Sequence, residues 1–271
     1  MFPSLTTKKM VTFTDFWPRL KVTSFWIFVS LACFHSGPYI ALVYWGGIHL
    51  VALYEMQTLL SVSLLSMIIN MLTSCLIFLG LSASHFGFPQ VNVEVMLPLA
   101  FIPFVCALID SRGNFWSTCV TGISFIWITI PCYLCYRLNL LNVNFMMAFL
   151  TVTWITDFGC YMAGHMFGRT PLLERISPKK TIEGSIGGAI VTFVVAHIIS
   201  HYNSYVGWTD WMVIAFIAVV FGQLGDLFES MFKRALQVKD SGSLIGRSGG
   251  LMDRFDSVFF SVVFVNAYLA L

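Results

Sequence analysis

The sequence has few charged residues. Only 10% of its 271 residues are Asp, Glu, Lys or Arg, whereas a soluble domain carries about a quarter. Hydrophobic residues make up 58% of the chain. So few charges cannot cover the surface of a water-soluble protein of this length, which excludes a soluble globular domain. The composition instead predicts an all-α, polytopic integral membrane protein.

The chain also lacks an excess of one charge and a disulfide framework. Its 15 Lys and Arg residues against 13 Asp and Glu residues give a net charge of +2, too small for bulk attraction to nucleic acid, so we expect no nucleic-acid partner. The seven cysteines lie in or beside apolar stretches, where a thiol behaves as a small hydrophobic group. Cys132 and Cys135 form a lone CxxC motif, and its apolar surroundings favour packing over zinc or redox chemistry.

Apolar stretches long enough to approach a membrane span, which takes about 20 residues, recur along the chain. Turn-forming residues such as Gly37 and Pro38 separate them. A basic amphipathic lead-in over residues 1–21 precedes the first stretch, and we expect it to remain in the cytosol. The sequence predicts about nine transmembrane helices, at residues 22–36, 38–55, 57–80, 91–109, 114–137, 140–165, 183–202, 208–227 and 254–271.

Most basic residues lie in two connections, 166–182 and 228–254. The positive-inside rule places both in the cytosol, and nine spans starting from a cytosolic N-terminus place them on the same side. Any chemistry in these connections therefore faces the cytosol. We expect a bacterial inner membrane, although the sequence alone does not separate it from an organellar one.

Acidic residues cluster around the second basic connection. Asp226 and Glu229 are three residues apart at the end of the eighth span, so they share a helix face. Asp253 and Asp256 are three apart where the last span begins, near a helix N-terminus that favours anions. We expect the two helix ends to face each other. Oxygen-only ligands of this kind suit Mg²⁺, so the two acid pairs predict a magnesium site.

Cationic and glycine-rich residues fill the loop between these acids. Lys233, Arg234 and Lys239 precede a run rich in glycine that includes Gly249 and Gly250. Bare backbone of this kind can approach phosphate oxygens closely. The combination predicts a metal and phosphate site; the alternative is a solvated loop with ordinary ion pairs at helix ends.

A second candidate phosphate site begins at Ser177. Ser177 and Pro178 are typical of an N-cap and first helical position, which predicts Lys179 and Lys180 in the first turn of the seventh span. Cations are unfavourable there unless an anion binds. The alternative is a lysine pair that anchors the membrane edge.

Asp157 lies inside the sixth apolar stretch. A carboxyl group there is costly unless it faces a partner or a wet cavity, so we expect it to line a polar cavity near the site. A neutral, hydrogen-bonded structural aspartate is the alternative.

The residues from Gly225 to Asp256 resemble the C-terminal motif of the phosphatidate cytidylyltransferases, the CDP-diacylglycerol synthases. Residues 177–184 and 157–169 are similar to that family too. The first 140 residues match only as a series of hydrophobic spans. We therefore expect an N-terminal transmembrane region, 1–140, and a catalytic region, 141–271. One departure is Ser248, which stands where the family has histidine, so that histidine's role would pass to Arg247 or water, or be lost.

The resemblance implies transfer of CMP from CTP to phosphatidic acid, a membrane lipid, giving CDP-diacylglycerol and pyrophosphate. We expect Asp226, Asp253 and Asp256 to hold Mg²⁺. The metal would bridge the phosphates, and lysines would neutralise the developing charge. The alternatives are another CTP-dependent lipid transferase, a lipid kinase or a non-catalytic transporter. A second cation and a homodimer are left open. The catalytic candidates are Lys180, Lys233, Lys239 and Asp240. The substrate-binding candidates are Ser177, Lys179, Thr181, Arg234, Arg247, Ser248, Gly249, Gly250 and Arg254.

Overall fold

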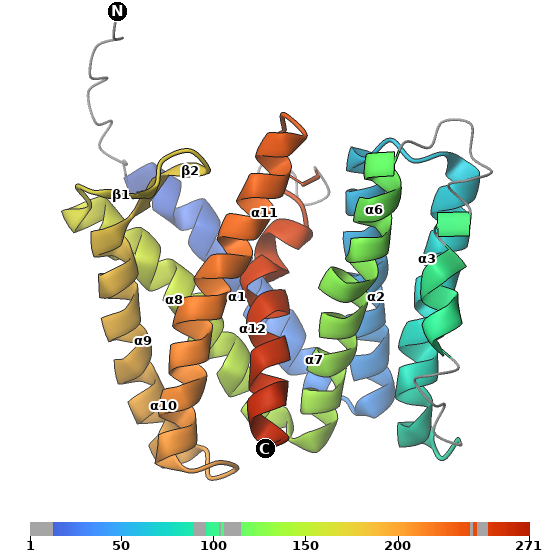
Figure 1. The fold of residues 1–271 in the computed structure, drawn as a ribbon. Coiled ribbons are helices and arrows are strands. Elements are labelled where there is room, and N and C mark those ends of the chain that lie inside the picture. Colours follow the sequence, from blue (N-terminus) through green and yellow to red (C-terminus); the bar gives the residue numbers. More distant parts are fainter. Residues whose placement is uncertain (1–12, 89–95, 103, 106–114, 239–240, 243–248) are drawn as a thin grey trace, which may run out of the picture.

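The computed structural model describes residues 13–88, 96–102, 104–105, 115–238, 241–242 and 249–271. These residues form a bundle of long helices with one small β-hairpin at one end (Figure 1). The predicted helical fold is confirmed, and the hairpin is an addition to it.

Some of the helices begin at a recognisable capping or start signal. Asn142 accepts a hydrogen bond from the Phe145 N–H at 2.8 Å, and Pro38 starts its helix after Gly37, whose φ is 111°. The helices are α1 (Phe13–His35), α2 (Pro38–Leu59), α3 (Leu64–Ser82), α6 (Phe115–Ser124), α7 (Ile130–Leu141), α8 (Val143–Phe167), α9 (Ile182–Tyr202), α10 (Trp208–Ile217), α11 (Gln223–Ala235) and α12 (Met252–Leu269). Shorter turns are the 3₁₀-helices η1 (Ala83–Phe86) and η2 (Leu97–Phe101) and the π-helical turns η3 (Phe125–Thr129) and η4 (Ala218–Gly222).

Six helical segments of the described chain are long and apolar enough to cross a membrane. They are Pro38–Leu59, Leu64–Phe86, Thr121–Leu141, Val143–Phe167, Ile182–Tyr202 and Trp208–Ala235. Each overlaps a predicted span. The predicted span at 91–109 lies partly outside the described residues. The lead-in is not a separate segment, because α1 already begins at Phe13.

The predicted helical start at Ser177 is wrong, although the span predicted at 183–202 agrees with helix α9 (Ile182–Tyr202). Ser177–Thr181 is strand β2, which pairs antiparallel with β1 (Pro171–Leu173). Helix α9 begins at Ile182, and the N-cap is Thr181, whose hydroxyl accepts from the Gly184 N–H at 3.1 Å. Because Ser177 and Pro178 belong to a paired strand, Lys179 and Lys180 lie on that strand and not in a helical turn.

Glu183 fixes the base of the hairpin. Its carboxylate accepts hydrogen bonds from the backbone N–H of Arg169 at 3.0 Å and of Thr170 at 3.1 Å. The Thr170 hydroxyl adds a third at 2.9 Å. These bonds join the first turn of α9 to residues 169 and 170, which follow α8. They therefore hold together the two ends of the hairpin.

Phe255 anchors the start of α12 in the hydrophobic core. It is fully buried, and three tryptophan rings surround it, with centroid distances of 5.6 Å to Trp26, 6.0 Å to Trp45 and 6.3 Å to Trp154. These rings come from α1, α2 and α8. Since Phe255 stands between Asp253 and Asp256, its packing fixes where both acids project.

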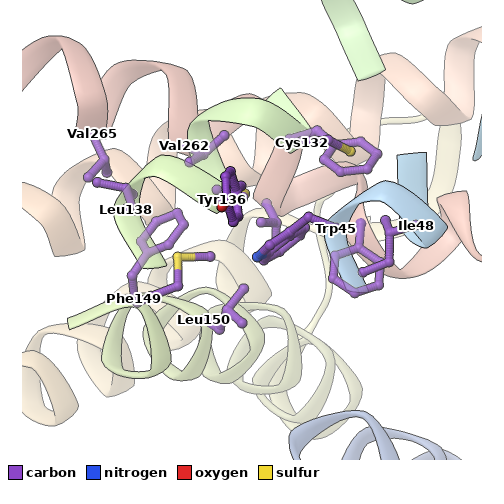
Figure 2. Packing of buried hydrophobic residues seen from close by; sticks show 14 of the residues in the cluster. Trp45, Ile48, Cys132, Tyr136, Leu138, Phe149, Leu150, Val262 and Val265 are labelled. Carbon is purple, nitrogen blue, oxygen red and sulfur yellow. The ribbon is translucent and has the colours of Figure 1, made fainter. Parts of the chain in front are cut away.

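Four helices meet in the centre of the bundle (Figure 2). Trp45 of α2, Tyr136 of α7, Leu150 of α8 and Val262 of α12 are fully buried there. The core therefore combines residues from both predicted regions. Cys132 and Cys135 are buried free thiols within it, in agreement with a packing role for the CxxC pair.

The described residues of the two basic connections lie at one end of the bundle. The hairpin and the end of α11 are together at the top of Figure 1, whereas α12 ends at the bottom. The described parts of both connections therefore lie at the same end of the bundle, and their position in the cytosol stays a prediction.

Helices α8 and α9 approach closely through glycine. A Cβ atom added at Gly188 would lie 2.8 Å from the backbone N and 3.0 Å from the Cα of Cys160. The neighbouring Thr192 hydroxyl donates to Thr156 Oγ1 at 2.9 Å. The two backbones can therefore sit in contact only because Gly188 has no side chain.

Gly188→Ala should force these two helices apart, because the obstructing atoms include the backbone N and Cα of Cys160. We expect a loss of about 1–3 kcal/mol of unfolding free energy, measured as earlier thermal unfolding in detergent. The matched control is Gly47→Ala, where an added Cβ meets nothing within 4 Å, so stability should stay equal or rise slightly. Equal unfolding temperatures for Gly188→Ala and wild type would contradict this packing argument.

Candidate active site

Lys180 and Asp226 form an ion pair between β2 and α11. Both side chains are partly exposed, at 24% and 32%, so this pair lies at the accessible edge of the site. Asp226 also accepts a long hydrogen bond from the Ser230 hydroxyl at 3.4 Å. Neighbouring strand residues point to opposite faces, and Lys179 is exposed. The hairpin therefore presents one lysine of the pair to the acids.

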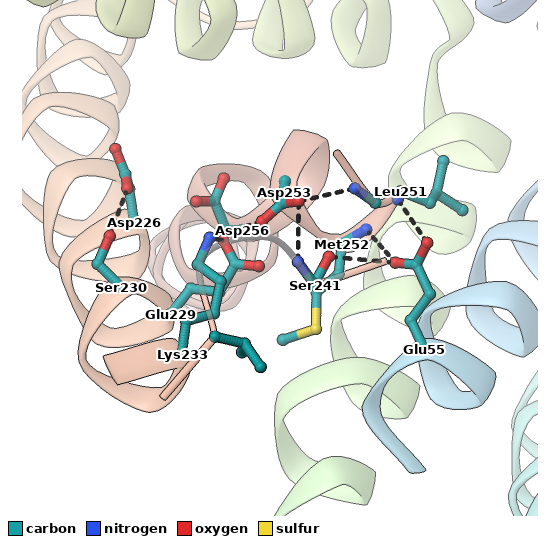
Figure 3. A network of polar contacts seen from close by, with 12 residues as sticks. Glu55, Asp226, Glu229, Ser230, Lys233, Ser241, Leu251, Met252, Asp253 and Asp256 are labelled. Carbon is teal, nitrogen blue, oxygen red and sulfur yellow. Dashed lines mark hydrogen bonds and ion pairs between the residues drawn. The ribbon is translucent and has the colours of Figure 1, made fainter. Parts of the chain in front are cut away.

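Lys233 joins the end of α11 to the start of α12. Its Nζ lies 3.2 Å from Glu229 Oε2, one helical turn away, and 2.5 Å from Asp253 Oδ1 (Figure 3). Glu229 is 1% exposed, and both Lys233 and Asp253 are 12% exposed. This buried contact confirms the predicted convergence of the two helix ends.

The second oxygen of Asp253 holds the glycine-rich loop. Asp253 Oδ2 accepts from the backbone N–H of Gly250 at 2.7 Å and of Ser241 at 3.1 Å. Gly249 has a φ of 88°, and a Cβ there would lie 2.5 Å from Asp253 Oδ2. Glycine is needed at this position for both reasons. Both carboxylate oxygens of Asp253 are therefore engaged by protein groups.

Asp256 lies deeper and faces other acids. It is 6% exposed, and its Oδ1 accepts the Ser257 N–H at 2.7 Å. The carboxyl groups of Asp226 and Glu229 are close enough to interact with it electrostatically. The Ser257 hydroxyl in turn donates to Asp157 Oδ1 at 3.1 Å. Asp157 thus has a partner next to the cluster, as an acid inside an apolar helix requires.

We call Lys180, Asp226, Glu229, Lys233, Asp253 and Asp256 the acid–lysine cluster. Within the described residues, its acids together with Asp157 outnumber its two lysines. Buried negative charge requires protons or cations for balance. The donors are all oxygen atoms, which fits a hard divalent cation such as Mg²⁺. Among the described residues, no three His, Cys, Asp or Glu side chains already form a metal-binding group, since lysine ammonium groups contact Asp226 and Asp253.

The remaining candidates surround this cluster unevenly. Ser177 and Thr181 lie on β2, and Thr181 caps α9. Arg234 donates to the Val238 carbonyl at 3.3 Å. Arg254 lies in the first turn of α12. Lys239, Asp240, Arg247 and Ser248 lie outside the described residues, and their roles stay predictions.

Sequence reasoning missed Glu55. This residue of α2 is 3% exposed and contacts the loop and the start of α12. The signal that identified Asp157, an acid within an apolar stretch, is present for Glu55 too.

Comparison with known proteins identifies the family. The profile of the cytidylyltransferase family matches residues 17–271. The chain belongs to this family. The match includes most of the first 140 residues, which the motifs did not cover, so the α2 helix that carries Glu55 is part of the family's shared sequence region.

Several bacterial relatives carry the name phosphatidate cytidylyltransferase. The protein of Staphylococcus haemolyticus is 31% identical over 81% of this chain and 86% of its own length. The protein of Bacillus subtilis is 30% identical over 90% of this chain and 93% of its own. That of Staphylococcus aureus strain COL is 28% identical over 90% and 95%. The recognition made from the motifs is confirmed.

Lys233→Met should destabilise the protein, because it leaves Glu229 and Asp253 buried without their shared cation. Removing one partner of a buried ion pair costs about 3–5 kcal/mol, measurable as earlier thermal unfolding in detergent. Ser230→Ala on the same helix removes only a long hydrogen bond and serves as control. A Lys233→Met protein as stable as Ser230→Ala would show that the bridge contributes nothing.

Proposed function

We propose that this protein is a phosphatidate cytidylyltransferase, which transfers CMP from CTP to phosphatidic acid and releases pyrophosphate. Family membership and the names of relatives across most of the chain support this. The observation that carries it is the acid–lysine cluster, where two helix ends and a β-strand bring carboxylates and lysines together at the basic end of a membrane bundle. A triphosphate and a lipid phosphate both need such a site.

We propose that the chain crosses a bacterial inner membrane nine times with its N-terminus in the cytosol. Six of the crossings are the long apolar segments, and the other three would be α1, α12 and the segment around residues 91–109. The position of the hairpin and the end of α11 at one end supports a cytosolic site. Phosphatidic acid would reach it sideways from the lipid, and CTP from the water. We leave open whether the protein forms a homodimer.

The proposed reaction is an in-line displacement at phosphorus. An oxygen of the phosphatidic acid phosphate forms a bond to the α-phosphorus of CTP, and the bond from that phosphorus to the bridging oxygen breaks, so pyrophosphate leaves with the electron pair. The attacking phosphate oxygen is already anionic and reaches the α-phosphorus directly, so no covalent enzyme intermediate is needed. The protein's task is positioning and charge neutralisation.

Each group of residues has a proposed part in this task. Mg²⁺ held by Asp226, Asp253 and Asp256, with or without a second cation, would supply Lewis-acid stabilisation of the phosphate charge. Lys180 and Lys233 lie at these carboxylates, where they neutralise charge on the phosphoryl groups. Lys239 is proposed to share this role. Asp240 would orient Lys239. Substrate contacts are proposed for Ser177, Lys179, Thr181, Arg234, Arg247, Ser248, Gly249, Gly250 and Arg254.

Two other enzyme classes and a transporter would use similar features. Another CTP-dependent lipid transferase or a lipid kinase would differ in the lipid acceptor, and a transporter would need no nucleotide. The named relatives favour phosphatidic acid. Replacing it by a polyprenol or an ether lipid in the assay separates these possibilities.

Purified protein with Mg²⁺, labelled CTP and phosphatidic acid should form CDP-diacylglycerol, and EDTA should abolish the reaction. Asp253→Asn should lower turnover by about hundredfold or more, because it removes a charge next to the reacting phosphates. The matched control is Asp210→Asn at the opposite end of the bundle, where Asp210 bonds Gly207 and Tyr268. Wild-type turnover by Asp253→Asn would refute the assignment of Asp253 as a metal ligand. Formation of CDP-diacylglycerol without added phosphatidic acid would refute phosphatidic acid as the substrate.

Reporter fusions should show that the N-terminal and C-terminal ends of the chain lie on opposite sides of the membrane. Green fluorescent protein placed before Met1 should fluoresce in the cytosol, and alkaline phosphatase placed after Leu271 should be active outside it. The exchanged pair of fusions, which should give neither signal, is the control. Inactive phosphatase at the C-terminal end would mean an even number of crossings.

A further inference from the structure

A buried acid from the N-terminal half contacts the start of α12. Glu55 lies near the end of α2, and only 3% of it is exposed. Its Oε1 accepts a hydrogen bond from the Leu251 N–H at 2.9 Å, and its Oε2 accepts one from the Met252 N–H at 3.0 Å (Figure 3). The two residues directly precede Asp253.

The same carboxylate also holds the loop. The Ser241 hydroxyl donates to Glu55 Oε2 at 3.3 Å, while the Ser241 N–H donates to Asp253 Oδ2 at 3.1 Å. Glu55 and Asp253 therefore bind the same residue from two sides. A shift of Glu55 would move both the loop and the backbone that carries Asp253.

Two glycines of the loop leave room for Glu55. A Cβ at Gly250 would lie 2.5 Å from Glu55 Oε2, and one at Gly242 would lie 2.7 Å from Oε1. Because any side chain would displace the carboxylate, these glycines are explained by the approach of backbone to Glu55. The sequence alone had connected Gly250 with phosphate binding only.

The contact supplies hydrogen-bond partners both to the Glu55 carboxylate and to the N–H groups at the start of α12. The first N–H groups of a helix have no partner inside it, and a carboxylate at that end is also favoured by the helix dipole. An acid within an apolar membrane helix, in turn, needs hydrogen-bond donors. Glu55 and the start of α12 supply each other's missing groups across a distance of nearly 200 residues in sequence.

We infer that Glu55 is a positioning residue for the proposed cytidylyltransferase reaction, on which this inference rests. By fixing the backbone of residues 251 and 252, it sets the direction in which Asp253 and Asp256 leave the first turn of α12. Its removal would loosen the carboxylates that are proposed to hold Mg²⁺.

Glu55→Gln tests this, because it keeps the shape but replaces one acceptor oxygen by an NH₂ group that faces backbone donors. Turnover should fall about tenfold to hundredfold, the usual effect of losing a supporting contact at a metal site, and the Mg²⁺ concentration for half-maximal activity should rise. Hydrogen–deuterium exchange at residues 250–256 should become faster in the absence of Mg²⁺ and nucleotide, while α8 and α9 remain protected.

His49→Gln is the matched control. His49 is equally buried on the same helix and bonds Thr129 at 3.1 Å, away from the loop. It should lower stability without changing the Mg²⁺ dependence or the exchange at 250–256. Glu55→Asp, which keeps the charge but is one carbon shorter, provides a second test if Glu55→Gln does not fold, and it should show the same faster exchange and weaker Mg²⁺ response.

The outcomes separate this inference from the proposed function. Active wild-type protein together with unchanged exchange and Mg²⁺ dependence in the Glu55 variants would overturn the inference alone. A wild-type protein that forms no CDP-diacylglycerol would overturn the proposed function. In that case, exchange at 250–256 still decides whether Glu55 holds α12, and unchanged exchange overturns the inference as well.

Discussion

The bridge from Glu229 through Lys233 to Asp253 is the contact on which the site depends. It crosses from α11 to α12 with all three side chains largely buried. In such surroundings charges interact strongly, and an unpaired member is expensive, so the two helix ends have one favourable arrangement. Asp226 lies about two turns before Lys233 on α11, and Asp256 lies one turn after Asp253 on α12, so the bridge also sets how closely these two acids approach.

Apolar packing and polar contacts act on α12 from two directions. The tryptophans around Phe255 fix one face of its first turn, and the carboxylate of Glu55 fixes its backbone N–H groups. Packing alone would leave those N–H groups without partners in a buried place. Hydrogen bonds alone would hold the backbone but leave the apolar side of this turn without packing. Together they orient the aspartates that the proposed reaction uses.

The site carries more negative than positive side chains among its described residues, and this imbalance suits its proposed substrates. A cation that neutralises the carboxylates also attracts phosphate oxygens. Lysines at the same carboxylates prevent full repulsion when the site holds no cation. The opposing charges thus keep the cluster assembled and leave it with affinity for metal and phosphate together.

Several features could be read from the sequence because they depend on local pattern. Apolar runs of membrane length gave the positions of the helices, and the spacing of Asp226 to Glu229 and of Asp253 to Asp256 placed each pair on one helix face. The resemblance of the motifs to one family rested on residue identity alone. The start of α9 was misjudged because the Ser-Pro signal at residues 177–178 is equally compatible with a strand, and pairing with β1 decided between them.

By itself, the sequence determined that this protein resides in a membrane, which end of it is basic and which acids lie near one another on a helix, because charge, hydropathy and helical period are properties of neighbouring residues. Only the tertiary structure decided that Lys180 reaches Asp226 and that Glu55 supports α12. Contacts between residues far apart in the chain depend on how the helices pack, and packing follows from the shapes of many side chains at once.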